Sequence, residues 1–174
     1  MTVIERDARL TELRRLGLSK ALIQLAAGEC LHRVFKDVCL GPPHYVYHRA
    51  KVPAGPALVP LWERDMMVAG VWLKPGGVEF IEFSAELPEG LRRLAGTEQG
   101  FWATRFDHLY ESDVSQEDLH AAADEVGFRF LERLLVSREA AEDGLNSFLA
   151  HQAWLQDLVA GIDQDALGAG KVEA

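Results

Sequence analysis

The sequence has few cysteines, no long apolar run and few basic residues, and each shortage excludes a class of protein. Cys30 and Cys39 are the two cysteines in 174 residues, too few for a cysteine-based zinc site. No apolar stretch reaches the roughly 20 residues that span a bilayer. The N-terminus, MTVIERDARL, carries acidic residues where a secretory signal peptide needs basic ones. We therefore expect a cytoplasmic protein that does not contact a membrane and keeps its thiols reduced.

The shortage of basic residues also limits the choice of partner. The chain has 18 Lys+Arg against 27 Asp+Glu, a net charge of −9. Such a surface repels nucleic-acid phosphates and anionic lipids, and it attracts basic proteins. We therefore expect no nucleic-acid partner. The length and the hydrophobic content of 48% are those of one globular domain, here 1–174, with its own core.

Helical periodicity at the N-terminus predicts a helical layer over about residues 7–38. Leucines recur at helical spacing up to Gly17, and Ser19 is placed to cap a second helix. We expect Pro42 and Pro43 to end that helix, because proline cannot continue one. The next tract, HYVYHR, is rich in strand formers and predicts a strand.

Three further strands are predicted in the central part of the chain. The run MMVAGVWL is almost wholly apolar, which indicates a strand covered on both faces. The turn KPGG separates it from the strand that follows. The predicted strands are Leu58–Glu63, Met66–Leu73 and Val78–Phe83. Together with HYVYHR they make a small mixed or antiparallel sheet, a meander near 44–84.

The C-terminal half predicts mainly helices. Leu91, Leu94 and Ala95 indicate a short helical turn, and Ser115 can cap a helix. The segment 128–136 fits either a strand or a helix. A last helix near 145–162 is expected to turn its apolar residues toward the core: Leu145, Phe148, Leu149, Leu155, Leu158 and Val159. A frayed tail is expected over about 163–174. The fold class is therefore α+β, with the sheet covered by N- and C-terminal helices.

Histidines are the main candidates for chemistry, but their spacing is unfavourable. His44 and His48 on a strand would lie roughly 13 Å apart, too far to share one metal ion. Asp107 and His108 are neighbours on a helix and so point in different directions. We expect no enzyme activity, no metal and no cofactor. A small enzyme using His44, His48 or His108 is the least favoured alternative.

The tip Trp62-Glu63-Arg64-Asp65, between two predicted strands, is a candidate recognition edge. Tryptophan is enriched in protein interfaces, although a turn with a tryptophan closing the core edge is the rival interpretation. A second acidic segment lies further along the chain. The predicted partner-binding residues are Trp62, Glu63, Asp65, Asp107, Glu111 and Asp113.

This interpretation makes two predictions about substitutions. Trp72→Ala should destabilise the fold more than Trp62→Ala. Replacing Glu63 and Asp65 by lysine should slow association with a basic partner and leave stability unchanged.

The segments LVPLWERDMMVAGVWLKPGGVEFIEFS and ELPEGLRRLAGTEQGFWATRF resemble the SUKH superfamily of immunity proteins and cell-wall-assembly regulators. The similarity runs over about 57–135, from Val59-Pro60-Leu61 to FWATRFDHLYESD. The family's N-terminal motif is absent, and LSKALIQLAAGECLHRVF stands there. The resemblance implies an α+β fold and a non-catalytic immunity role, in which a protein toxin is neutralised by direct binding. A small acidic secretion chaperone or adaptor is the alternative.

Overall fold

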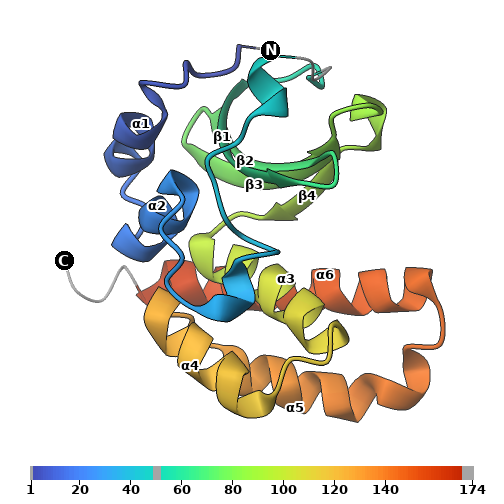
Figure 1. Ribbon diagram of the computed structural model, residues 1–174. Helices are drawn as coiled ribbons and strands as arrows, with labels where there is room; N and C mark the ends of the chain where they lie inside the picture. The colour runs from blue at the N-terminus through green and yellow to red at the C-terminus, as the bar shows by residue number, and fades with distance from the viewer. Residues whose placement is uncertain (1, 49–51, 170–174) are drawn as a thin grey trace. The chain divides into compact units, whose positions relative to one another are not determined.

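The computed structural model describes residues 2–48 and 52–169, and it divides into two compact units, Met1–Arg93 and Leu94–Ala174. A four-stranded antiparallel meander and six α-helices confirm the expected α+β class (Figure 1). The single domain expected from the length stays a prediction.

The sheet follows the chain in simple order, β1-β2-β3-β4. The three predicted strands are confirmed to within two residues at each end, and the fourth was missed. The strands are β1 Ala57–Arg64, β2 Met67–Lys74, β3 Gly77–Ser84 and β4 Arg92–Ala95.

The helical turn predicted at Leu91–Ala95 is wrong, because this segment forms β4 after a short 3₁₀ turn, η3 Pro88–Gly90. Arg92 approaches Glu82 on β3 at 3.4 Å, and Arg93 approaches Glu79 at 3.6 Å. Opposite charges on paired strands favour the pairing.

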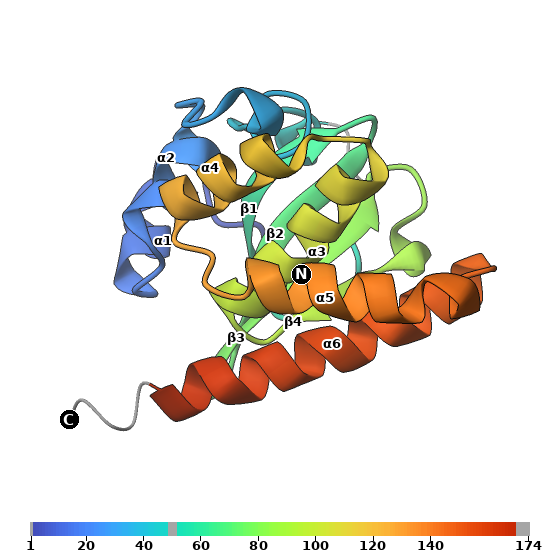
Figure 2. The ribbon, with the colours of Figure 1, turned by 90° about the horizontal axis from the view of Figure 1, so that it is seen from below.

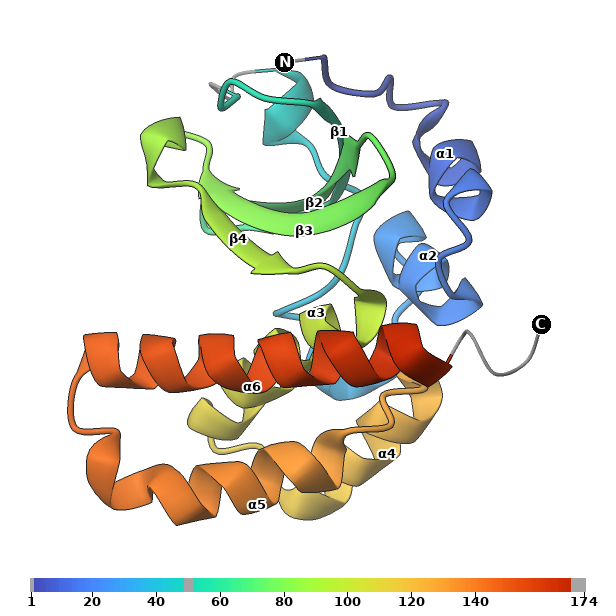
Figure 3. The same cartoon turned by 180° about the vertical axis from the view of Figure 1, so that it is seen from behind.

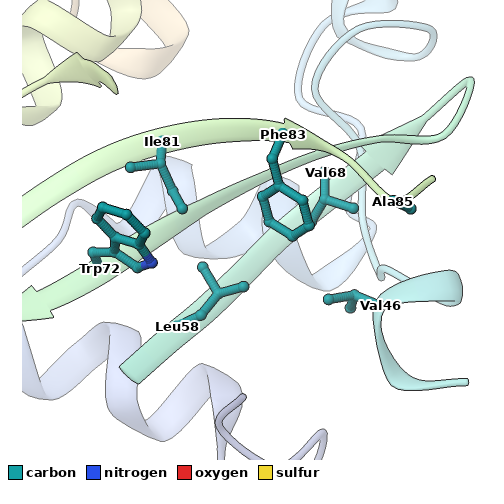
Figure 4. Packing of buried hydrophobic residues seen from close by; sticks show 7 residues of the cluster. All are labelled: Val46, Leu58, Val68, Trp72, Ile81, Phe83 and Ala85. Carbon is teal, nitrogen blue, oxygen red and sulfur yellow. The ribbon is translucent and has the colours of Figure 1, made fainter. Parts of the chain in front are cut away.

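The sheet of the first unit encloses an apolar cluster, seen from close by in Figure 4. Trp72 of β2 and Leu58 of β1 lie beside Ile81 and Phe83 of β3. Trp72 is 4% exposed, which agrees with a strand covered on both faces.

Two short helices precede the sheet. They are α1 Arg9–Arg15 and α2 Lys20–Ala27. Ser19 caps α2 as predicted, since its hydroxyl accepts a hydrogen bond from the Leu22 N–H at 3.1 Å. The helical layer to residue 38 is wrong over its second part, because α2 ends at Gly28. Gly28 has φ +98, a conformation that favours glycine, and after it only a 3₁₀ turn forms, η1 Arg33–Phe35.

The strand predicted from HYVYHR is also wrong. Tyr45–Tyr47 form a 3₁₀ turn, η2, while Arg49 lies outside the described residues. The carboxylate of Glu63, on β1, accepts hydrogen bonds from the backbone N–H groups of His44, Tyr45 and Val46. One acceptor for three successive N–H groups holds the backbone in a turn and keeps these groups from a strand partner.

A buried arginine joins α1, α2 and β1. Arg9 is 3% exposed, and its guanidinium donates to the carbonyls of Ala26 at 2.8 Å, Leu61 at 3.1 Å and Pro60 at 3.2 Å. The pairing of β1 with β2 shifts register between Pro60 and Trp62. Such a bulge leaves carbonyls without partners in the strand-to-strand hydrogen bonds, and the last carbonyls of a helix also lack partners. Arg9 donates to carbonyls of both kinds, those at the bulge of β1 and the one near the end of α2.

The second unit is helical. It contains α3 Glu98–Glu111, α4 Gln116–Val126, α5 Leu131–Ala141, the 3₁₀ turn η4 Glu142–Gly144, and α6 Phe148–Ala169. The predicted Ser115 cap is confirmed, because its hydroxyl accepts from the Asp118 N–H at 3.2 Å. The ambiguous segment 128–136 is helical from Leu131 onward. No helix among the described residues has the combined length and apolar character that crossing a bilayer requires.

A long-range cap ties α6 to the start of α3. The Asp163 carboxylate accepts from the backbone N–H of Gly96 at 2.7 Å and of Thr97 at 3.0 Å. Negative charge is favourable at a helix N-terminus. A Cβ at Gly100 would meet the Asp163 carboxylate at 2.2 Å, so this approach requires glycine.

The last helix departs from the sequence expectation at both ends. The frayed tail is wrong over 163–169, which are helical, while 170–174 lie outside the described residues. Leu155, Leu158 and Val159 are buried as predicted, but Phe148 is 69% and Leu149 is 74% exposed. Leu145 precedes the helix and is half-buried.

We predict that Arg9→Met destabilises the protein by about 3 kcal/mol or more, because it leaves three buried carbonyls without donors. Arg15→Met on the same helix is the matched control. Arg15 is exposed and pairs with Glu12, so its loss should shift the unfolding midpoint little. Urea unfolding of both variants gives the comparison, and equal midpoints would contradict the role assigned to Arg9.

Candidate functional site

The predicted recognition tip is a tightly held turn. Glu63 is engaged with the η2 backbone and so is not free for a partner. Trp62 is only 2% exposed, which contradicts its placement at an interface rim. The expectation that Trp62→Ala costs less than Trp72→Ala therefore loses its basis, since both indoles are buried.

The turn itself also serves the fold. Asp65 and Met66 have φ of +46 and +66, as a tight two-residue hairpin requires. Met66 packs against the apolar cluster, and its carbonyl accepts from the Ala85 N–H at 2.7 Å. Asp65 is exposed. Lysine at position 63 would remove the acceptor of three backbone N–H groups of η2, so the expectation of unchanged stability loses its basis.

The other three predicted residues lie at or just beyond the C-terminal end of α3 in the second unit. Glu111 and Asp113 are exposed, but Asp107 is 2% exposed and cannot act as a rim charge. Asp107 and Glu111 meet around Arg138 of α5, which forms ion pairs with both carboxylates. His151 of α6 completes the cluster.

His151 contacts both members of the buried ion pair. Its Nε2 lies 2.9 Å from a carboxylate oxygen of Asp107 and 3.2 Å from a guanidinium nitrogen of Arg138. The same guanidinium nitrogen is paired with Asp107. Asp107 is thus contacted by side chains from two helices, α5 and α6.

Aromatic rings cover the cluster on the α3 and α6 sides. The Arg138 guanidinium lies over the Tyr110 ring at 4.7 Å and near the Trp154 ring at 5.7 Å. The His151 ring stacks on Trp154, whose indole N–H donates to Ser137 at 3.0 Å. Burial raises the pKa of Asp107, and the nearby Arg138 and His151 oppose that rise. The arrangement orders side chains around one buried carboxylate.

The cluster brings together three side chains of the types that bind metal ions, from α3 and α6. Asp107, Glu111 and His151 place one ligand atom each within 4.8 Å of one another. Arg138 already supplies the positive charge between the two carboxylates, so a metal ion would have to displace it. The absence of a bound metal stays a prediction.

The predicted separation of roughly 13 Å between His44 and His48 is also wrong. His44 and His48 flank the η2 turn, and their ring centroids are 4.7 Å apart. Arg6 donates to His48 Nε2 at 3.1 Å, which occupies one of the two ring nitrogens of His48. His108, the third histidine considered, lies on α3 and is exposed.

An open hollow of about 520 Å³ lies along α1 and α2 in the first unit. Apolar side chains such as Leu10 and Ile23 line it together with Arg14 and Lys20. It contains none of the histidines considered above and neither cysteine.

Charge is divided unequally between the two units. Met1–Arg93 contains 13 Lys+Arg and 11 Asp+Glu, a net charge of +2, whereas Leu94–Ala174 contains 5 and 16, a net charge of −11. Within the described part of the second unit two basic residues are exposed, Arg129 and Arg133. Eleven acidic residues are exposed there: Glu111, Asp113, Glu117, Asp124, Glu125, Glu132, Glu139, Glu142, Asp143, Asp157 and Asp165. The acidity of the chain therefore belongs to its helical unit.

Comparison with protein-family models, curated proteins and solved structures finds no match for this chain.

Sequence reasoning found Asp107 and Glu111 but missed Arg138 and His151, which complete the cluster. Arg138 is 31 residues from Asp107 and belongs to a segment whose secondary structure was ambiguous. The spacing Asp107–Glu111, one helical turn apart, was the local sign that both carboxylates share a face.

We predict that Arg138→Met destabilises the protein by about 3–5 kcal/mol, because Asp107 is left as a buried charge without its main partner. Adding Asp107→Leu should recover most of this loss, since an apolar pair replaces the ion pair. Urea unfolding of the single and double variants measures both. A double variant less stable than Arg138→Met would contradict the assignment.

A histidine on α4 predicts a pH effect. His120 Nδ1 lies 2.7 Å from the Gln116 carbonyl and Nε2 lies 2.6 Å from Glu132, and these contacts raise its pKa. A raised pKa means that the stabilisation is fully present below the unfolded pKa and is lost as pH rises through the folded one. We therefore expect the stability difference between wild type and His120→Ala to be larger at pH 5.5 than at pH 8.5. These pH values lie roughly one unit below and roughly two units above the ordinary pKa of histidine. Thermal unfolding at both pH values is the measurement, and a difference independent of pH would refute it.

Proposed function

We propose that this chain is a non-catalytic binding protein of the immunity type, which neutralises a basic protein toxin in the cytoplasm through its acidic helical unit. The observation that carries the proposal is the division of charge, +2 in the first unit and −11 in the second. A field of one sign over one unit speeds encounter with a partner of opposite sign.

Two further observations support the proposal. The charged groups that the fold uses internally, among them Glu63, Asp107 and Asp163, are engaged with backbone or with buried partners. Other exposed acids of the second unit, such as Glu125, Glu139 and Asp143, are separate from these, so binding can use them without disturbing these contacts. The resemblance of 57–135 to the SUKH superfamily indicates a binding role of the same kind.

The test compares two variants of equal net charge. One removes four exposed acids of the second unit: Glu125→Gln, Glu139→Gln, Glu142→Gln and Asp143→Asn. The other removes four exposed acids of the first unit: Asp7→Asn, Asp65→Asn, Glu86→Gln and Glu89→Gln. Both change the net charge from −9 to −5.

We expect a partner captured from the native host to associate several-fold more slowly with the second-unit variant at low salt, and at nearly wild-type rate with the first-unit variant. The difference should shrink at about 0.15 M salt, where the Debye length is about 8 Å. Stopped-flow association measures both. Equal slowing by the two variants, or a partner that is acidic, would refute the proposal.

A further inference from the structure

The most exposed large apolar side chains of the described chain are adjacent. Leu149 is 74% and Phe148 is 69% exposed, and both stand in the first turn of α6. Ser147 precedes them as a cap, since its hydroxyl accepts from the Ala150 N–H at 3.2 Å. The local structure around the two side chains is therefore ordered, and it presents them to solvent.

The register of the α5–α6 pair explains why nothing covers these side chains. The two helices are antiparallel, because Arg138 meets His151 while Arg133 meets Asp165 at 2.5 Å. The Arg138 cluster lies against Glu111, the last residue of α3. Residues beyond this level have no α3 to pack against. Figures 2 and 3 show the α5–α6 turn extending past the end of α3.

The surroundings of Phe148 and Leu149 are acidic. The connection from α5 to α6 contains the exposed residues Glu142 and Asp143, and Glu139 is exposed in the last turn of α5. The nearest basic residue before the turn, Arg138, is paired with Asp107 and Glu111. An apolar centre with a polar, charged rim is the usual composition of a protein-binding surface.

We propose that the α5–α6 turn, with Phe148 and Leu149 at its centre and Glu139, Glu142 and Asp143 at its rim, is the docking surface for a basic protein segment that presents apolar side chains among its lysines or arginines. The inference rests on the proposed function and adds the surface and the chemistry of the partner. The acidic rim repels a second acidic chain and attracts a basic one, so charge favours a foreign partner over a second copy.

Two labelled helical peptides of equal length and equal positive charge test this surface, one composed of lysine and leucine and the other of lysine and serine. Fluorescence anisotropy gives the dissociation constants. We expect wild type to bind the Lys/Leu peptide at least about tenfold more tightly than the Lys/Ser peptide. The double variant Phe148→Ser with Leu149→Ser should lose that preference and bind the Lys/Ser peptide as wild type does.

The matched control is Leu167→Ser. Leu167 lies on the same helix, is 62% exposed and is near the opposite end. This variant should keep the tenfold preference. Melting temperatures of all three proteins should agree, since the altered side chains are exposed.

Each other outcome overturns a defined part of the proposal. A double variant that keeps the preference, or a Leu167→Ser variant that loses it equally, removes this surface and leaves the acidic unit as a binding unit. Failure of both peptides to bind at low salt overturns the proposed function itself. A wild-type dimer in sedimentation that the double variant abolishes would make a second copy the occupant and refute a foreign basic partner.

Discussion

The first unit depends on one buried guanidinium. Arg9 of α1 lies where α2 ends and where β1 changes register, and these two elements leave three carbonyls that accept from its guanidinium. Guanidinium can serve several acceptors at once from a planar, rigid group, which a lysine cannot do. Burial lowers the pKa of Arg9, but the partial negative charge at the end of α2 favours the cation. Arg9 therefore attaches two short helices to β1, in addition to their buried apolar residues Leu13, Leu22 and Leu25.

Carboxylates also satisfy backbone groups, as acceptors of hydrogen bonds from N–H groups. Glu63 collects the N–H groups that begin η2, and Asp163 collects those that precede α3. In each case a charged side chain satisfies backbone groups distant in sequence, 17 to 19 residues away for Glu63 and 66 to 67 for Asp163. These residues look like surface charges in the sequence, but their role is internal. The distinction matters for function, because the charges that remain exposed in the described part of the second unit are acidic, except for Arg129 and Arg133.

Features that depend on neighbouring residues were predictable from the sequence. The apolar run MMVAGVWL and the KPGG turn located the three strands, and Ser19 and Ser115 cap helices as expected. Features that depend on side chains distant in sequence were not predictable. HYVYHR has the composition of a strand, yet the Glu63 carboxylate holds it in a turn. Trp62 precedes three charged residues, yet it is buried, because β1 is covered on both faces from Leu58 to Trp62.

The candidate site shows the same limit. The two carboxylates of α3 could be paired from their spacing, but nothing local points to Arg138 or His151 as their partners. The resemblance to a known family supplied a function and no residue of this cluster. The exposure of Phe148 and Leu149 was equally hidden, because the helical pattern that buries Leu155 and Leu158 continues back toward them. Only the length of the neighbouring helix α3 decides whether that pattern is covered.

One alignment of α5 and α6 against α3 explains both the buried charges of the second unit and its exposed apolar residues. A buried ion pair contributes little net stability compared with an apolar pair, but it allows fewer alternative alignments. Asp107 must meet both Arg138 and His151, and this fixes how α5 and α6 align against α3. A slide of one helical turn would bury Phe148 near the end of α3 and would separate His151 from Asp107. The cluster therefore holds the α5–α6 turn in the alignment that leaves Phe148 and Leu149 in solvent, beside the acids of η4.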